Sequence, residues 1–503
     1  MKEISWKSLT LFLIIALMLV ACGGDAAEEA AEAEVEEPTA EVEEAETEEE
    51  AAEPVEEEAA TEEEAVVEEE AAAEEEAEAT GDGAVEIRWF IGLGAGGNPE
   101  EIEREEAFVE KFNEAYGDQY TLVMDVVPNE TAYDVLKTQI ASGDVPDIVG
   151  PVGIRGLASF EGAWLDLSPY IQESDYDMSD FGPALVEFYQ FGTGNQLFLP
   201  LSVFPSALFY NKALFDEAGL EYPPHEWGAP YADGDEWTFD KMKELAMFLT
   251  VDANGNDATM GEFDPDNIVQ FGYDSQWQDI RADWTHMGAG SFVDEDGNAI
   301  IPEIWREAAH WYYDGMFTDY FIPNDSYVNS DLMAQGNTFG SGNLAMDAVN
   351  LWFNCCTEGV DWDVAAIPSY NGELTSKLHA DTFGILKGVE NPDAAWEVYS
   401  LLMGEFAGDL VNVYGAFPAR QSLQDGAMAN LEERFPGVDF QVFVDGLSYP
   451  DNPSHESAMP NFLKASDTYA SFGANYQSTP DLDLDAELLN LQDELQSVYD
   501  EVQ

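Results

Sequence analysis

The chain contains 503 residues, with 104 acidic residues against 17 basic residues and a formal net charge of −87 at pH 7. This balance excludes nucleic acid as a partner, because nucleic-acid binding requires a basic surface that neutralises phosphates. The length allows two or three ordinary domains, and three cysteines are too few for a framework of disulfide bonds.

An export signal is predicted at the N-terminus. Lys2 and Lys7 give a positive start, and residues 9–21 form an apolar run shorter than the roughly 20 residues that a membrane-spanning helix needs. The run ends in small residues directly before Cys22, which resembles the lipobox of bacterial lipoproteins. The resemblance implies removal of residues 1–21, acylation of the Cys22 thiol and anchoring to the cell membrane on its outer side. The alternative is an uncleaved signal anchor with an incidental cysteine.

An acidic tether is predicted over residues 22–83. Within it, residues 25–80 contain 28 acidic residues and no basic residue. Such a segment cannot bury enough apolar surface to offset its ordering entropy, and its like charges repel. We therefore expect a disordered tether that holds a folded part away from the membrane. The excess of acid beyond Thr80 is interpreted as solvated surface, with a cationic solute as the alternative.

Strands and helices alternate from about residue 84 onward. Apolar residues with a period of two predict a strand over residues 85–91, and Asn98 is placed to cap a helix that extends to Tyr116. The next elements are predicted at residues 121–127 (strand), 133–141 (helix) and 147–149 (strand). This order implies a parallel sheet with helices on its faces.

The same alternation recurs in the second half of the chain. Further strands are predicted at residues 207–210, 269–273, 344–348, 362–367 and 382–386. Residues 484–502 form an amphipathic helix in which Leu and Val recur every three or four positions. About 420 residues of α/β structure exceed what one core usually supports, so two lobes are expected.

Several segments carry a resemblance to a known family. The longest is LFYNKALFDEAGL at residues 208–220, and the others are GDVPD (143–147), NQLFLP (195–200), FGSGNLAM (339–346), VAAIP (364–368) and YGAFPAR (414–420). In this order they resemble family 1 extracellular solute-binding proteins, the group of ABC-transporter sugar-binding lipoproteins that includes maltose-binding proteins. Two features depart from the pattern, since residues 221–237 are longer than usual and the pair Cys355-Cys356 is extra. Whether these cysteines form a disulfide stays open.

The resemblance implies an α/β, two-lobed periplasmic-binding-protein-like fold of type II, with the ligand cleft between lobes joined by a multi-strand hinge. Residues 84–206 with about 383–420 would form lobe 1, and residues 207–382 with about 421–503 would form lobe 2. Closure of such lobes is driven by contacts that exist only when both grip the ligand.

Candidate ligand-binding residues lie near predicted strand ends and helix starts, where open α/β sheets bind ligands. Aromatic rings can cover the apolar faces of a sugar, and carboxylates, amides and guanidinium groups can bind its hydroxyls. The candidates are Asn98, Tyr210, Asp274, Trp277, Asn350, Trp352, Asp381 and Arg420. A core position is the alternative for each tryptophan, and Trp89 and Trp396 are expected in the core.

The resemblance implies a monomeric lipoprotein that captures a sugar or oligosaccharide and delivers it to the permease of an ABC importer. The alternatives are a secreted carbohydrate-active enzyme, a surface adhesion or signalling protein, and a binding protein for a cationic solute such as a polyamine. We expect no catalysis and no metal, because neither H-E-x-x-H nor G-x-S-x-G occurs and the five histidines lack metal-ligand spacing.

Two further motifs are interpreted as loops rather than ligand sites. Gly92, Gly94 and Gly97 match G-x-G-x-x-G, but the helix starts after these glycines, so no dinucleotide cofactor is expected. Residues 252–257 resemble a calcium loop whose glycine falls at the fourth position instead of the sixth, which favours a plain turn.

Overall fold

The computed structural model describes residues 84–191 and 193–502. The predicted export signal, the lipid anchor at Cys22 and the acidic tether therefore lie outside the described residues. Among the residues that are described, no helix is both long enough and apolar enough to cross a membrane.

The first part of the fold is a parallel sheet with helices on its faces. Strand β1 (Val85–Ile91) lies between β2 (Tyr120–Val126) and β3 (Ile148–Gly153) and runs parallel to both. Helices α2 (Pro99–Tyr116) and α3 (Asn129–Ser142) connect these strands, as the alternation predicts.

Neighbouring residues of β1 serve two different cores. Trp89 is fully buried and packs against Phe108 and Phe383 on one face of the sheet. Phe90 is also fully buried but belongs to the core on the other face, because successive strand side chains point to opposite sides. Trp396 lies in the same core as Trp89, so the prediction that both are core residues is confirmed.

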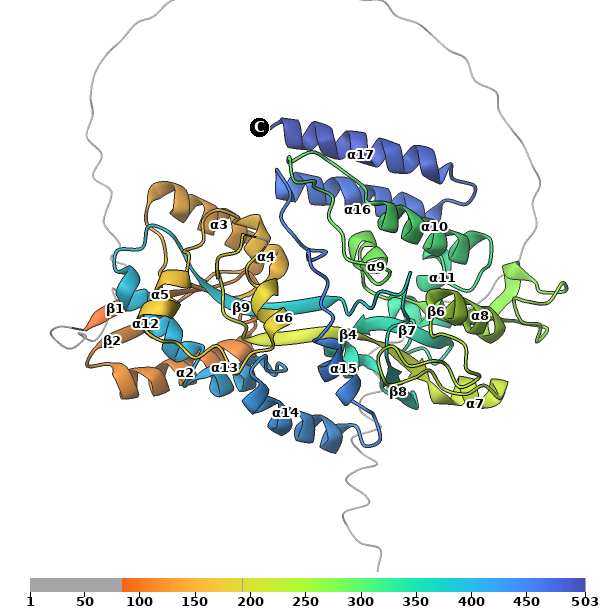
Figure 1. Cartoon of the computed structure of the whole chain (residues 1–503), viewed down its shortest axis with the longest axis horizontal. Helices are drawn as coiled ribbons and strands as arrows, with labels where there is room; N and C mark the ends of the chain where they lie inside the picture. The colour runs from red at the N-terminus through yellow and green to blue at the C-terminus, as the bar shows by residue number, and fades with distance from the viewer. Residues whose placement is uncertain (1–83, 192, 503) are drawn as a thin grey trace, which may run out of the picture. The chain divides into compact units, whose positions relative to one another are not determined.

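Two long strands join the two parts of the fold (Figure 1). Strand β9 (Leu378–Ile385) is antiparallel to β3 on one side and to β4 (Ser202–Asn211) on the other. Further along, β4 is antiparallel to β7 (Leu344–Asn350) and to β8 (Trp362–Ala365). The strand order is β2-β1-β3-β9-β4-β7-β6-β5, so one continuous sheet runs through both parts.

The second part continues this sheet beneath a layer of helices. Strand β6 (Ile268–Asp274) is parallel to β7, and the short β5 (Val251–Asp252) forms the edge. Helices α16 (Phe462–Ser478) and α17 (Leu484–Asp500) lie side by side above α10 (Glu303–Phe317) in Figure 1. The leucines predicted to form the apolar side of the last helix are buried.

The remaining helices are α4 (Ile154–Ser159), α5 (Ser168–Glu173), α6 (Pro183–Phe188), α7 (Lys212–Ala218), α8 (Phe239–Leu249), α9 (Ile280–Thr285), α11 (Asp325–Val328), α12 (Pro392–Leu402), α13 (Ala407–Tyr414), α14 (Gln421–Arg434) and α15 (Gln441–Gly446), with short 3₁₀ helices η1 (Pro265–Asn267), η2 (Asp331–Gly336) and η3 (Leu351–Cys356).

Candidate functional site

One face of the connecting strand β9 carries two polar side chains. His379 and Asp381 are two residues apart, so they point to the same side of the strand. Phe204 of β4 lies directly opposite His379, and Gly153 of β3 lies directly opposite Asp381. A side chain at Gly153 would crowd the carboxylate, because a Cβ there would lie 3.2 Å from Asp381 Oδ1.

A cavity of about 810 Å³ reaches this region at Trp352 and at Phe204, the residue opposite His379, but His379 and Asp381 are not among its lining residues. Phe204 of β4 and Trp352 of η3 line it on one side, and residues of α13 and α14 line it on the other side. Its size lies within the range of small-molecule sites, which is about 300 to 1,000 Å³.

A stack of four rings leads from the cavity wall to β9. The ring of Trp277 is parallel to that of Trp352, with centroids 6.2 Å apart and planes 7° apart. The rings of Trp352 and His379 are nearly parallel and lie side by side, with centroids 6.3 Å apart and planes 16° apart, because the in-plane indole N–H of Trp352 donates to His379 Nδ1. The rings of His379 and His455 have centroids 5.2 Å apart and planes 20° apart. Parallel aromatic planes of this kind suit the flat, apolar C–H faces of a sugar ring.

Trp277 holds an unusual backbone conformation within this stack. Its φ is 58°, a left-handed value that is rare for a bulky residue, and its side chain is 52% exposed. The indole N–H donates to the carbonyl of Gly336 at 2.8 Å, which fixes the ring. Strained conformations of this kind are concentrated at ligand sites.

Carboxylates and histidines at the site are titratable groups removed from water. Burial raises the pKa of Asp381 to about 6, and within the described part of the chain no donor reaches its carboxylate. Burial likewise raises the pKa of Glu456 to about 7, although the backbone N–H and the charge of Arg155 act in the opposite direction. Burial holds the pKa values of His379 and His455 well below 6.5, so both rings are neutral near pH 7.

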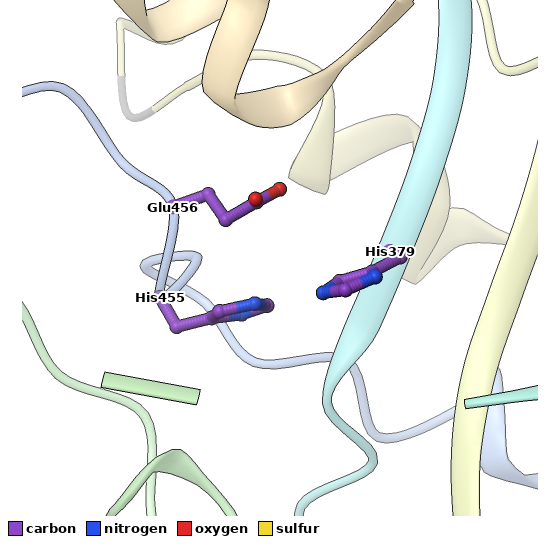
Figure 2. Close-up of side chains that lie close together, drawn as sticks. All are labelled: His379, His455 and Glu456. Atoms are coloured by element: carbon purple, nitrogen blue, oxygen red, sulfur yellow. The ribbon is translucent and has the colours of Figure 1, made fainter. Parts of the chain in front are cut away.

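His455 and Glu456 reach the site from the segment that precedes α16. Figure 2 shows both side chains converging with His379 on one space. One ring nitrogen of each histidine and a carboxylate oxygen of Glu456 all lie within 4.8 Å of one another. The site therefore combines aromatic faces, neutral nitrogen atoms and carboxylates, which is the chemistry that recognises polyhydroxylated molecules.

The family described as bacterial extracellular solute-binding protein matches residues 98–405. The chain belongs to this family. Its members are binding proteins, and membership places this protein outside the cytoplasm.

Relatives and solved structures agree with this assignment. The solute-binding protein is 29% identical to a putative binding protein of Brucella abortus over 319 residues, which cover 58% of this chain and 67% of the relative. Its fold resembles UspC of Mycobacterium tuberculosis, with a TM-score of 0.62, 20% identity and coverage of 82% of this chain and 100% of that one. The sugar-binding protein MalE of Xanthomonas citri gives a TM-score of 0.62, 18% identity and coverage of 83% and 98%. The cyclic α-maltosyl-1,6-maltose binding protein of Arthrobacter globiformis gives a TM-score of 0.59 and 17% identity, with coverage of 84% of this chain and 99% of that one. The two-lobed type II fold expected from the sequence is thus confirmed.

The structure brings three of the predicted residues of this solute-binding protein together. Trp352 contacts His379, Trp277 lies on the far side of Trp352, and Asp381 shares a strand face with His379. Trp277 also lines a second cavity of about 390 Å³ together with Asp274. The carboxylate of Asp274 accepts from the hydroxyl of Thr338 and from the backbone N–H of Ser275.

Two predicted residues hold the scaffold around the site. The buried amide of Asn350 donates to the carbonyl oxygens of Phe204 and Lys377, and so ties the end of β7 to the connecting strand. The side-chain oxygen of Asn98 accepts from the backbone N–H of Glu101 and caps α2, as the sequence predicts.

Tyr210 and Arg420 make structural contacts elsewhere in the fold. The hydroxyl of Tyr210 donates to Asp363, and its ring packs against Phe215. Arg420 forms an ion pair with Asp180 at 3.1 Å, and its guanidinium group lies 4.5 Å from the ring centroid of Phe181. Neither side chain lines the cavity of about 810 Å³, and Asp381 does not line it either.

The sequence reasoning missed His379, His455 and Glu456. His379 lies only two residues before the candidate Asp381, and correct placement of the strand would have put both on one face. No local signal marks His455 or Glu456, because they lie in an irregular segment more than 70 residues further along the chain.

Two open points about loops are clarified by the contacts. One carboxylate oxygen of Asp252 accepts backbone N–H groups of Asn254 and Asn256, and the other accepts the N–H of Asp264 and the Asn256 amide. These bonds occupy the oxygens that a calcium ion would need, so the plain turn is favoured.

Cys355 and Cys356 form a vicinal disulfide in η3, and Cys355 lines the large cavity.

Proposed function

We propose that this protein captures a sugar or oligosaccharide outside the cytoplasm and delivers it to the permease of an ABC importer, without altering it chemically. The ring stack of Trp277 and Trp352 beside the carboxylate of Asp381 carries the proposal. Among proteins of similar fold, one is a sugar-binding protein and another binds a cyclic maltosyl-maltose. The cavity of about 810 Å³ has room for a small sugar or oligosaccharide.

The ligand cleft is proposed to lie between two lobes. Residues 84–206 with about 383–420 form lobe 1, and residues 207–382 with about 421–503 form lobe 2. The proximity of Arg155 in α4 to Glu456 supports this assignment, because it couples the two parts next to the ring stack. A ligand held between the lobes would strengthen such contacts and favour closure.

A thermal-shift and calorimetry panel tests the proposed function. Maltotriose, D-tagatose and other neutral sugars are compared with spermidine and with a neutral peptide. One sugar is expected to bind one to one and to stabilise the protein by about 2.7 kcal/mol at a hundredfold excess over Kd. Recovery of the sugar intact by chromatography excludes the enzyme alternative. Binding of spermidine without binding of any sugar would overturn the proposal in favour of a cationic solute.

Membrane attachment through Cys22 is part of the same proposal. Acylation of Cys22 would anchor a monomer to the outer side of the cell membrane, with residues 23–83 as tether. Replacing Cys22 with Ser is expected to move the protein from the membrane fraction to the medium or periplasm, because a serine hydroxyl is not acylated by the lipoprotein pathway. Immunoblots of fractionated cells measure this, with Cys355→Ser as control. Retention of the Cys22→Ser variant in the membrane would favour the uncleaved signal anchor.

A further inference from the structure

The hydrogen bond between His455 and Asp451 fixes the tautomer of one histidine. His455 Nδ1 lies 2.7 Å from Asp451 Oδ2. The Asp451 carboxyl also accepts the backbone N–H groups of Leu378 and His455. Burial raises the pKa of this carboxyl to about 7 although these bonds lower it, so the carboxyl is mostly ionised at pH 8. An ionised carboxylate can only accept, so His455 Nδ1 carries the hydrogen and His455 Nε2 carries a lone pair.

A different bond fixes the opposite tautomer in the neighbouring histidine. The indole N–H of Trp352 points to His379 Nδ1 at 3.2 Å. An indole nitrogen can only donate, so His379 Nδ1 is the acceptor and the hydrogen of the neutral ring lies on Nε2. His379 therefore presents a donor where His455 presents an acceptor.

The free nitrogen atom of His455 has an unmet hydrogen-bonding need. His455 is 2% exposed, and its Nε2 has no hydrogen-bond partner among the described residues. One ring nitrogen of each histidine and one carboxylate oxygen of Glu456 lie within 4.8 Å of one another (Figure 2). An oxygen atom can lie within hydrogen-bond distance, about 2.8 Å, of two nitrogens at that separation.

A hydroxyl group fits this arrangement better than a metal ion does. A hydroxyl has one hydrogen to donate and two lone pairs, so it can accept from His379 and donate to His455 at once. A metal ion would need a lone pair from each ring, but His379 Nε2 carries a hydrogen as long as Trp352 donates to Nδ1. Glu456 is then placed to accept from a hydroxyl on the adjacent carbon.

We propose that His379 and His455 form a donor and acceptor pair of opposite tautomers that reads one hydroxyl group of a neutral ligand, with Glu456 accepting from the adjacent hydroxyl. The ligand class is therefore a molecule with neighbouring free hydroxyl groups, and amines or metal ions are disfavoured at this position. The identification of this molecule as a sugar rests on the proposed function. The assignment of opposite tautomers does not depend on the proposed function.

Nitrogen-15 NMR of the imidazole rings tests the pair directly in the ligand-free protein at pH 8, which is above the pKa of about 7 of Asp451. The chain has only five histidines, and single His→Gln variants assign their signals. We expect hydrogen on Nε2 of His379 and on Nδ1 of His455. Trp352→Phe keeps a ring but removes the N–H, so His379 should become a mixture of tautomers and His455 should stay unchanged. The same tautomer in both rings would overturn the proposal.

Zinc and sugar titrations complete the test. Equimolar Zn²⁺ is expected to leave the signals of His379 and His455 in place, and a one-to-one shift of both by Zn²⁺ would overturn the proposal in favour of a metal site. For each sugar of the panel that binds, His455→Phe should weaken binding at least tenfold, whereas replacement of the exposed His310 of α10 by Phe should not. Unchanged affinity in His455→Phe would also overturn it. Absence of any sugar binding with the opposite tautomers present would instead reject the proposed function.

Discussion

Replacing Asp381 with Asn is expected to stabilise the ligand-free protein at pH 8 and to weaken its binding of sugar. The carboxyl has a folded pKa of about 6, above the value of 3.8 that it has when free, because it is partly buried and lacks a hydrogen-bond donor. The folded state thus binds the proton more tightly than the unfolded state does. The carboxyl costs no stability below pH 3.8, an increasing amount between pH 3.8 and 6, and a constant amount above pH 6.

The size of this cost follows from the shift in pKa. Each pKa unit corresponds to 1.36 kcal/mol, so the ionised carboxyl costs on the order of 2 to 3 kcal/mol at pH 8. Thermal denaturation at pH 5 and pH 8 measures the difference, with Asp134→Asn on the exposed side of α3 as control. We expect a clear gain for Asp381→Asn at pH 8, a smaller gain at pH 5 and little change for the control.

Sugar affinity should change in the opposite direction. A hydroxyl donates more strongly to a carboxylate than to an amide oxygen, and such charge-assisted bonds contribute about 1.5 to 3 kcal/mol. Asp381→Asn should therefore weaken binding by about tenfold or more. A variant that is less stable at pH 8, or that binds sugar as tightly as the wild-type protein, would contradict the assignment of Asp381 to the site.

The alternation of strands and helices could be predicted because it depends on local patterns. Burial with a period of two in β1 and helical spacing in α17 both follow from contacts that each element makes along its own length. The start of β9 was wrong, since the sequence places it at residue 382 and the structure at Leu378. That error of four residues left His379 outside the predicted strand and so away from the face that it shares with Asp381.

The direction of the connecting strands was the main obstacle to predicting the site. The sequence treats the end of each strand as a place for a ligand, which assumes that neighbouring strands are parallel. Because β4 is antiparallel to β7, Tyr210 lies opposite Met346, whereas Asn350 lies opposite Ser206. The end of β4 therefore points away from the end of β7, where Trp352 follows. No local pattern reveals such a reversal.

A long-range ion pair of Arg420 could not be predicted from the sequence either. Arg420 follows the motif YGAFPAR, and nothing near it in the sequence shows that Asp180 would be its partner. A charged residue in a loop can serve the scaffold or the ligand, and only the fold decides between them. The tryptophans were easier to interpret, because Trp277 and Trp352 follow parallel strands whose carboxyl ends do meet.

Replacing Trp352 with Ala is expected to weaken sugar binding strongly without unfolding the protein. Trp352 is only partly buried, lines the large cavity, stacks with Trp277 and contacts His379. Its loss removes an aromatic face for the sugar and the N–H that fixes the tautomer of His379. Hot-spot tryptophans typically contribute 2 kcal/mol or more, so the affinity should fall by about thirtyfold or more.

A graded series separates binding from stability. Trp352→Phe keeps a ring and loses the N–H, so its affinity should lie between those of the wild-type protein and Trp352→Ala. Phe112→Ala is the structural contrast, because Phe112 is fully buried in the core around Trp89 and packs against Phe406. Loss of such a side chain costs about 3 to 5 kcal/mol of stability. Calorimetry gives the affinities, and circular dichroism with thermal denaturation gives the fold. If Trp352→Ala binds the sugar unchanged while its fold is intact, Trp352 does not belong to the binding site, and the ring stack would then serve only to join η3 to β9.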